Sequence, residues 1–256
     1  MAENLSDLKN MVAAMDAELR VGIVPDYPQA MNGLQLENGG RVTKIGAAVD
    51  ASLAVIEKVI AEGCDLLIVH HGLFWHGAQM ITKANYRKLK LAMDSGLAIY
   101  SAHIPLDVHP KLGNNACLAA EIGMSATEPY HEWKGIQLGL SQVMDVALEE
   151  LIGRMEKAVG GKVHVCAGRR GDSVGRVGVI TGGAGSEIAA MAAEGIDTFI
   201  TGEGPHWSYP LAEELGVNVI YGGHYATETF GVKALAGWLA ERSGLDWCFV
   251  DHPTGL

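Results

Sequence analysis

Short apolar runs alternate with amphipathic segments along most of this chain. Runs such as LLIV and LAIY predict buried strands, whereas apolar residues spaced three or four positions apart predict helices. The first cycle predicts strand 44–49, helix 52–62, strand 65–69, helix 86–94 and strand 97–101. This βαβαβ order is typical of a mainly parallel sheet flanked by helices.

The same order of elements returns in the second half of the chain. Strands are predicted at 176–181, 197–201 and 217–221, and helices at 186–194 and 209–215. Glycine stops and aliphatic strands are common in all α/β units, which is the alternative explanation. A single constant offset of 132 positions between identical residues favours an internal duplication. The identical pairs are Gly46/Gly178, Ala61/Ala193, Glu62/Glu194, Gly63/Gly195, Asp65/Asp197, Ile68/Ile200 and Gly72/Gly204.

The flanking segments complete the predicted fold. A helix is expected within residues 5–19, a long Pro-, Asn- and Gly-rich loop at 25–40, and a strand, an amphipathic helix and a strand within 132–168. We therefore expect an α/β protein of two interlinked α/β domains, with mainly parallel or mixed sheets flanked by helices. The first domain is predicted to comprise residues 1–125 and 226–256, and the inserted second domain residues 126–225.

The acidic composition narrows the classes of partner. The 256 residues have a formal net charge of −11 and contain no basic run. Because nucleic-acid phosphates are bound by clustered Lys and Arg, a nucleic-acid partner is disfavoured. A small anionic substrate stays compatible, since bound divalent cations would dominate the field inside a pocket.

The cysteines and the N-terminal residues indicate a cytoplasmic protein. Cys64, Cys117, Cys166 and Cys248 form no Cys-x-x-Cys pair and lie among apolar neighbours, as buried thiols do in a reducing compartment. The first residues lack the basic and apolar regions of a signal peptide, and no segment is apolar over eighteen residues. We expect no membrane association.

Histidines and carboxylates gather where three predicted strands end, in the segments VHHG, HIPLD and GHYATE. Strand ends of an α/β sheet are where ligands usually collect. A single histidine there is more often structural, but several imidazoles with two carboxylates predict a metal site. Without thiolates, this ligand chemistry suits zinc, iron or manganese in a catalytic centre. The candidates are His70, His71, His103, Asp107, His224 and Glu228.

The repeat relates the two halves of this predicted site. Each half ends in a histidine followed four positions later by a carboxylate, and the repeat aligns His71 with Glu203. The second half also lacks the long connection at 74–85. We therefore expect two half-sites that contribute unequally.

Three other features each have a favoured structural interpretation. The glycine-rich turn TGGAGSE at 181–187 could hold a phosphate on its amides, but a tight strand-to-helix turn is favoured. Trp75, Trp133 and Trp207 could stack on a flat ligand, but packing in the core is the favoured interpretation. The remaining six histidines are expected to be structural and to lack a matched carboxylate, with contact to a substrate as the alternative for His76 and His206; the other four are His109, His131, His164 and His252.

The ordered segments IVHHGLFW, HIPLDVHPKLGNNACLA, TGGAGS, ITGEG and YGGHYATETFGVKALAGWL resemble the NIF3 family, also named GTP cyclohydrolase 1 type 2. The resemblance runs from the NGLQLEN loop at 32–38 to the last helix. It implies a two-domain α/β fold, two divalent metal ions in a dinuclear centre between the domains, and a ring-shaped homohexamer built as a trimer of dimers. The metal ligands that it implies are His70, His71, Asp107, His224 and Glu228.

The resemblance also implies roles for single residues. His103 matches a position close to the ions, as a ligand or as a neighbour of one. Asp107 and Glu228 are the implied bridges, because a carboxylate readily spans two ions. The implied reaction is hydrolysis of a nucleotide, in which metal-bound hydroxide attacks guanine C8 of GTP and formate is released. His103 and Glu203 are the candidates for proton transfer.

Three hypotheses of function follow from these observations. The first is a metal-dependent hydrolase of a nucleotide or related small molecule, motivated by the mixed histidine and carboxylate ligands. The second is a non-catalytic metal-binding or regulatory hexameric scaffold, which a closed coordination shell would favour. The third is a DNA-associated ring, against which acidic side chains in the pore would argue. We rank them in this order.

Overall fold

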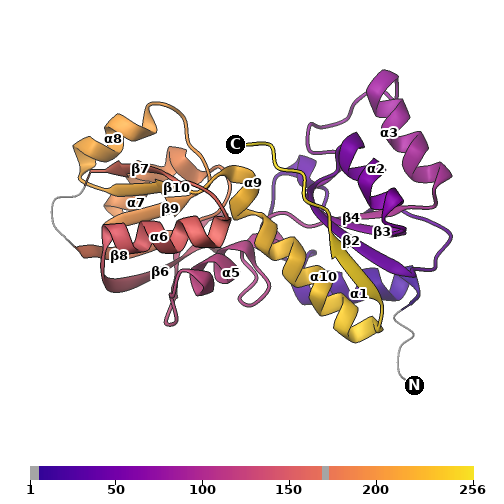
Figure 1. Cartoon of the computed structure of the whole chain (residues 1–256), viewed down its shortest axis with the longest axis horizontal. Helices are drawn as coiled ribbons and strands as arrows, with labels where there is room; N and C mark the ends of the chain where they lie inside the picture. The colour runs from indigo at the N-terminus through magenta and orange to yellow at the C-terminus, as the bar shows by residue number, and fades with distance from the viewer. Residues whose placement is uncertain (1–5, 169–172) are drawn as a thin grey trace. The chain divides into compact units, whose positions relative to one another are not determined.

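A computed structural model describes residues 6–168 and 173–256. Contacts divide the chain into two units, of which the first runs up to Leu106 and resumes at Gly231–His252. The second unit comprises Asp107–Phe230 and Pro253–Leu256. The sequence prediction set the corresponding boundaries at 125/126 and 225/226. Figure 1 follows the chain through both units.

The first unit is built on a five-stranded sheet in the order β1-β4-β3-β2-β11. Four neighbouring strands run parallel, and the edge strand β1 pairs antiparallel with β4. The strands are β1 (Gly33–Leu36), β2 (Lys44–Asp50), β3 (Leu66–His71), β4 (Ala98–Ser101) and β11 (Asp246–Phe249).

Helices cover both faces of this sheet (Figure 1). Helices α2 (Leu53–Ala61) and α3 (Lys83–Asp94) pack on one face, in a core with alternate strand residues such as Leu67 and Val69. Helices α1 (Leu8–Leu19) and α10 (Thr229–Ser243) lie on the other face. Because β3 is covered on both sides, its six residues are all buried, as expected for a central parallel strand.

The second unit is built on a six-stranded mixed sheet in the order β5-β6-β8-β9-β10-β7. Strands β8, β9 and β10 run parallel, whereas β6 pairs antiparallel with β8 and β7 pairs antiparallel with β10. The strands are β5 (Glu128–Trp133), β6 (Ile136–Ala147), β7 (His164–Ala167), β8 (Ser173–Val179), β9 (Thr198–Thr201) and β10 (Asn218–Tyr221).

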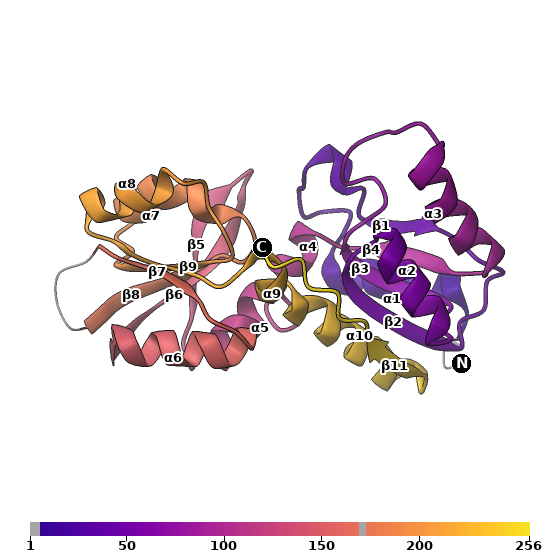
Figure 2. The same cartoon turned by 45° about the horizontal axis from the view of Figure 1, so that its top comes forward.

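Two layers of helices cover this sheet (Figure 2). One core contains residues of α5 and α6 and the other contains residues of α7 and α8, each against its own face of β9 and β10. The helices are α5 (Asn114–Glu121), α6 (Leu148–Val159), α7 (Ile188–Ala193) and α8 (Ser208–Leu215). The prediction of an α/β protein with two helix-flanked sheets is therefore confirmed.

The strand register supports the internal duplication. In the first unit Ile45 pairs with Leu66 between β2 and β3, and in the second unit Val177 pairs with Thr198 between β8 and β9. Both partners are displaced by the same 132 positions that the sequence repeat predicts. If a strand slipped by one residue against its neighbour, all of its side chains would turn to the opposite face of the sheet. The equivalent register in the two sheets therefore keeps equivalent residues facing the core of each unit.

The duplication extends further than the sequence indicated. Strand β1 pairs with β4 at one sheet edge, and β7 pairs with β10 at the equivalent edge of the other sheet. A twelve-residue helix precedes each of these edge strands, α1 in one unit and α6 in the other. The long loop predicted at 25–40 is therefore wrong in part, because strand β1 lies within it.

One pair of aspartates makes equivalent hydrogen bonds in both sheets. Asp65 accepts hydrogen bonds from the amides of Thr43 (2.9 Å) and Lys44 (3.2 Å), and Asp197 accepts one from the Arg176 amide (2.8 Å). Each carboxylate thereby ties the start of one parallel strand to its neighbour.

None of the helices within residues 6–168 and 173–256 has the length and apolar character that a membrane-spanning helix needs.

Replacing Asp65 with Ala should lower the free energy of unfolding by about 1 kcal/mol, because hydrogen bonds to charged acceptors contribute roughly 1.5–3 kcal/mol and these bonds are partly exposed to solvent. Asp197→Ala should cost a similar amount in the second unit. Asp246→Ala, on an exposed position, is the control and should change stability by less than about 0.5 kcal/mol. Urea unfolding followed by circular dichroism checks this prediction, which an Asp65→Ala protein as stable as the control would contradict.

Candidate metal centre

The first unit gathers three histidines at adjacent strand ends. His70 and His71 are the last residues of β3, and His103 follows β4, its parallel neighbour. The three side chains each offer a nitrogen, and these nitrogens all lie within 4.8 Å of one another. All three residues are buried. Imidazoles at this spacing can share a divalent ion.

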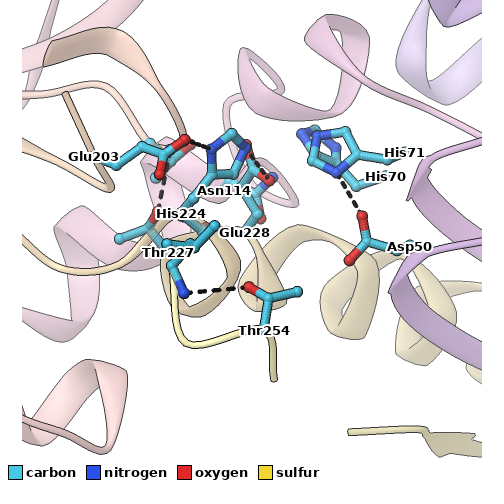
Figure 3. Close-up of polar contacts among 12 residues, drawn as sticks. Asp50, His70, His71, Asn114, Glu203, His224, Thr227, Glu228 and Thr254 are labelled. Atoms are coloured by element: carbon cyan, nitrogen blue, oxygen red, sulfur yellow. Dashed lines mark hydrogen bonds and ion pairs between the residues drawn. The ribbon is translucent and has the colours of Figure 1, made fainter. Parts of the chain in front are cut away.

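Each of these imidazoles is oriented by a hydrogen bond at Nδ1. The His70 Nδ1 lies 2.9 Å from the Ala102 carbonyl oxygen, and the His71 Nδ1 lies 3.0 Å from Asp50 Oδ1 (Figure 3). The His103 Nδ1 lies 2.9 Å from Asp26 Oδ1. Carbonyl and carboxylate oxygens only accept hydrogen bonds, so Nδ1 donates in each pair and Nε2 is the nitrogen that could bind a metal ion.

Asp26 is a site residue that the sequence analysis missed. Its side chain is only 6% exposed and accepts hydrogen bonds from His103 Nδ1, the Ile104 amide (2.9 Å) and Asn32 Nδ2 (2.8 Å). Burial raises the pKa of Asp26, but the hydrogen bond and electrostatic attraction of His103 and the bond from Asn32 lower it below its ordinary value overall. Asp26 is therefore an ionised anchor for His103.

Trp75 packs against two of the histidine rings. Its ring centroid lies 5.0 Å from that of His71 and 4.4 Å from that of His103. Trp75 is half-buried. Core packing was expected, and the structure instead places the half-buried indole against two candidate ligands.

The second unit gathers a histidine and two carboxylates. His224 begins the four-residue helix α9 (His224–Thr227), and Glu228 follows directly after it. The His224 Nδ1 lies 2.8 Å from Glu203 Oε1, and its Nε2 lies 3.2 Å from Glu228 Oε2 (Figure 3). The predicted i, i+4 pair is therefore formed, and Glu203 orients its histidine.

The glycine-rich turn packs against this cluster. A Cβ atom at Gly182, where φ is +70°, would lie 2.2 Å from Glu228 Oε1, so only glycine leaves room for the carboxylate. The Gly182 amide donates to Thr227 Oγ1 (3.1 Å), and the Gly185 amide donates to the Glu203 carbonyl (3.0 Å). Because these amides have partners in the protein, the turn acts as a packing element around Glu228.

Asp107 is held by hydrogen bonds within the second unit. It ends the short helix α4 (Ile104–Asp107) and accepts hydrogen bonds from Asn114 Nδ2 (2.8 Å) and Thr181 Oγ1 (3.4 Å). Asn115 in turn accepts from the Thr181 amide at 2.8 Å. Asp107 is half-buried, so its carboxylate is held in place and still accessible.

The two carboxylates beside His224 change its protonation. Burial lowers the pKa of His224, but hydrogen bonds and charge attraction from Glu228 and then Glu203 outweigh this effect and raise it to about 9. Without metal, His224 is therefore an imidazolium at neutral pH. An ion that binds Nε2 must displace this proton, so metal uptake at neutral pH releases it.

The donor set fits divalent metal ions. In four imidazoles Nδ1 is hydrogen-bonded to an oxygen acceptor, as is usual in metal-bound histidines. The fourth of these, His224, also has two carboxylates beside it. Within residues 6–168 and 173–256, the groups of side chains spaced for a metal include no cysteine. Such nitrogen and oxygen donors suit zinc, iron or manganese.

Two of the remaining histidines have structural contacts, and His131 departs from expectation. His109 accepts a hydrogen bond from the Leu112 amide at 2.9 Å, and the His164 ring lies 5.5 Å from that of Tyr209. His131 was expected to lack a carboxylate, but its Nδ1 lies 2.8 Å from Glu194. The partner is 63 residues away in the sequence, which local spacing could not reveal.

We expect His224 in the metal-free protein to titrate near pH 9 in an NMR pH series. Its folded pKa is above the ordinary value of 6.5, so its contribution to stability is complete below pH 6.5 and is lost as pH rises through about 9. Glu203→Gln should move the titration toward 6.5. An unshifted His224 in the metal-free protein would contradict the ion-pair account.

Asp26→Asn should weaken metal binding, because the neutral amide loses the charge that anchors His103. Loss of such outer partners usually costs about 10- to 100-fold in metal affinity. Competition with a chromogenic chelator measures the change, and Asp246→Asn at an exposed position serves as the control. Equal metal affinity in both variants would argue against an orienting role for Asp26.

Known proteins resemble the chain over nearly its whole length. Residues 6–254 match the family model described as Duf34/NIF3 (NGG1p interacting factor 3). A GTP cyclohydrolase 1 type 2 homolog from Deinococcus radiodurans is 39% identical over 240 residues, which cover 93% of this chain and 90% of the relative. The structure of TTHA1606 from Thermus thermophilus is 39% identical with a TM-score of 0.85, and that of protein ybgI, described as of unknown function, is 35% identical with a TM-score of 0.88. Each comparison covers 98% of this chain and 100% of the solved one. The chain therefore belongs to the DUF34/NIF3 family.

Proposed function

We propose that this protein is a metal-dependent hydrolase that binds two divalent ions and acts on a nucleotide or a related small molecule. The name GTP cyclohydrolase 1 type 2 homolog, which its relatives bear, supports a nucleotide substrate. The proposed ligands are His70, His71, Asp107, His224 and Glu228, with His103 as a ligand or as a neighbour of one.

The orientation of the four histidines is the observation that carries this proposal. His70, His71, His103 and His224 each direct Nδ1 to an oxygen atom at 2.8–3.0 Å. Metal-bound histidines almost always show this arrangement, because the outer hydrogen bond selects the tautomer and raises ligand basicity. His131 has a similar bond to Glu194 but lies outside the group, so the support comes from four such histidines among the candidate ligands.

Bound ions would supply Lewis-acid activation of water and would stabilise negative charge that develops on the substrate. The chain's own residues would handle the protons. Glu203 bonds His224 through Oε1, and its side chain is 44% exposed, so it can exchange a proton with solvent. His103, hydrogen-bonded to Asp26, is the second candidate for proton transfer.

We also propose that the protein forms a hexameric ring, which measurement of its mass in solution tests.

The proposal predicts that Asp107→Ala and Glu228→Ala lose metal and turnover together. Element-resolved analysis of protein purified without added metal should find about two ions per wild-type chain. Because outer partners alone are worth about 10- to 100-fold, loss of a ligand should reduce formate release from GTP by more than about 100-fold. Glu214→Ala, at an exposed position of α8, is the matched control.

The result also separates hydrolysis from a non-catalytic scaffold. Metal bound at full occupancy without formate release from GTP or related nucleotides would favour the scaffold. Formate release that persists in chelated, metal-free protein would contradict the hydrolase proposal.

A further inference from the structure

A pocket of about 630 Å³ opens in the first unit, beside the segment that follows the HHG motif. Its walls come from residues 28–36 and from residues 73–93, which include most of α3. This volume lies within the range of roughly 300–1,000 Å³ that is usual for small-molecule sites. The proposed reaction does not use this pocket.

The lining of the pocket is apolar and uncharged. Leucine, isoleucine, methionine and phenylalanine make up half of the lining residues, and the polar lining side chains are all carboxamides. Burying a phosphate or carboxylate against such a wall would leave its charge without a partner, which is costly. The carboxamides are Gln29, Gln35, Gln79 and Asn85.

Hydrogen bonds hold the walls of the pocket in place. Gln35 donates from Nε2 to the carbonyls of Ala30 and Met31, both at 3.0 Å, and accepts from the Leu73 amide at 2.6 Å. Asn85 Nδ2 donates to the Met80 carbonyl at 3.2 Å. Two carboxamides are thus used structurally, and the exposed Gln29 and Gln79 are positioned to meet a ligand.

The same segment connects the pocket with the histidine cluster. Leu73 and Phe74 line the pocket, whereas the next residue, Trp75, packs against the rings of His71 and His103. Gly72 joins this segment to His71, and a Cβ at Gly72 would lie 2.3 Å from Gln35 Oε1. A molecule that moves residues 73–74 therefore moves the neighbour of two candidate ligands.

We propose that this pocket binds an uncharged, mainly apolar small molecule that carries a hydrogen-bonding group for a carboxamide. Neutral heterocycles suit this lining for two reasons. Methionine sulfur makes favourable contacts with aromatic rings. A carboxamide can form two hydrogen bonds with a heterocycle edge that carries a donor beside an acceptor. Met31 and Met93 supply the sulfur atoms, and Phe74 supplies an aromatic face.

Fluorescence titration with Nile red, a neutral ring system with a carbonyl acceptor, tests the proposal. The anionic dye 8-anilinonaphthalene-1-sulfonate provides the charged comparison. We expect saturable binding of one Nile red per chain, in metal-free and metal-loaded protein alike, and binding of the anionic dye at least about tenfold weaker.

Three variants locate the binding site. Met93→Glu places a charge on the lining at a residue that is 59% exposed, and Ala78→Trp fills the space; each should weaken Nile red binding at least about tenfold. Met80→Glu makes the same change at a residue that is 84% exposed and outside the lining, so binding should be unchanged.

Nile red binding is measured without metal or turnover. This proposal can therefore fail independently of the hydrolase proposal. Absence of saturable binding, equal binding of the anionic dye, or equal loss in Met80→Glu and Met93→Glu would overturn it. A change in oligomeric mass for Met93→Glu and Ala78→Trp, without loss of dye binding, would show instead that this surface contacts another chain.

Discussion

The hydrogen bond that Nδ1 of each candidate histidine donates to an oxygen atom is the interaction on which the proposed metal site depends. An imidazole can present either nitrogen, and its ring can rotate, so unsupported histidines would not converge on an ion. Here Ala102, Asp50, Asp26 and Glu203 select one nitrogen in each case. Three of these acceptors are carboxylates, which also favour cation binding by their charge.

The duplicated fold explains how these residues reach their positions. Each sheet includes three neighbouring parallel strands that follow one another in the chain, and the candidate ligands lie at or after the ends of the second and third of these strands. The equivalent strand ends are filled differently, with His71 in one unit and Glu203 in the other. The two units therefore offer different donors at equivalent positions of a similar framework.

The local pattern predicted the repeated strands and helices because each has a buried face with a regular period. It also located the candidate ligands, because strand ends are marked by the change from apolar to polar residues. Asp26 and Asp50 could not be found in this way, since they lie 77 and 21 positions from their histidines. Strand β1 was missed because its short edge position is set by pairing with β4 rather than by its own composition.

Long-range ¹⁵N–¹H NMR of the histidine rings in zinc-loaded protein tests the central claim most directly, because it reports separately on Nδ1 and Nε2. The account predicts a protonated Nδ1 and a metal-shifted Nε2 for His70, His71 and His224, with Nδ1 of His103 also protonated. Protonated Nε2 atoms in the zinc-loaded protein, or ring signals that do not change when zinc is added, would contradict it.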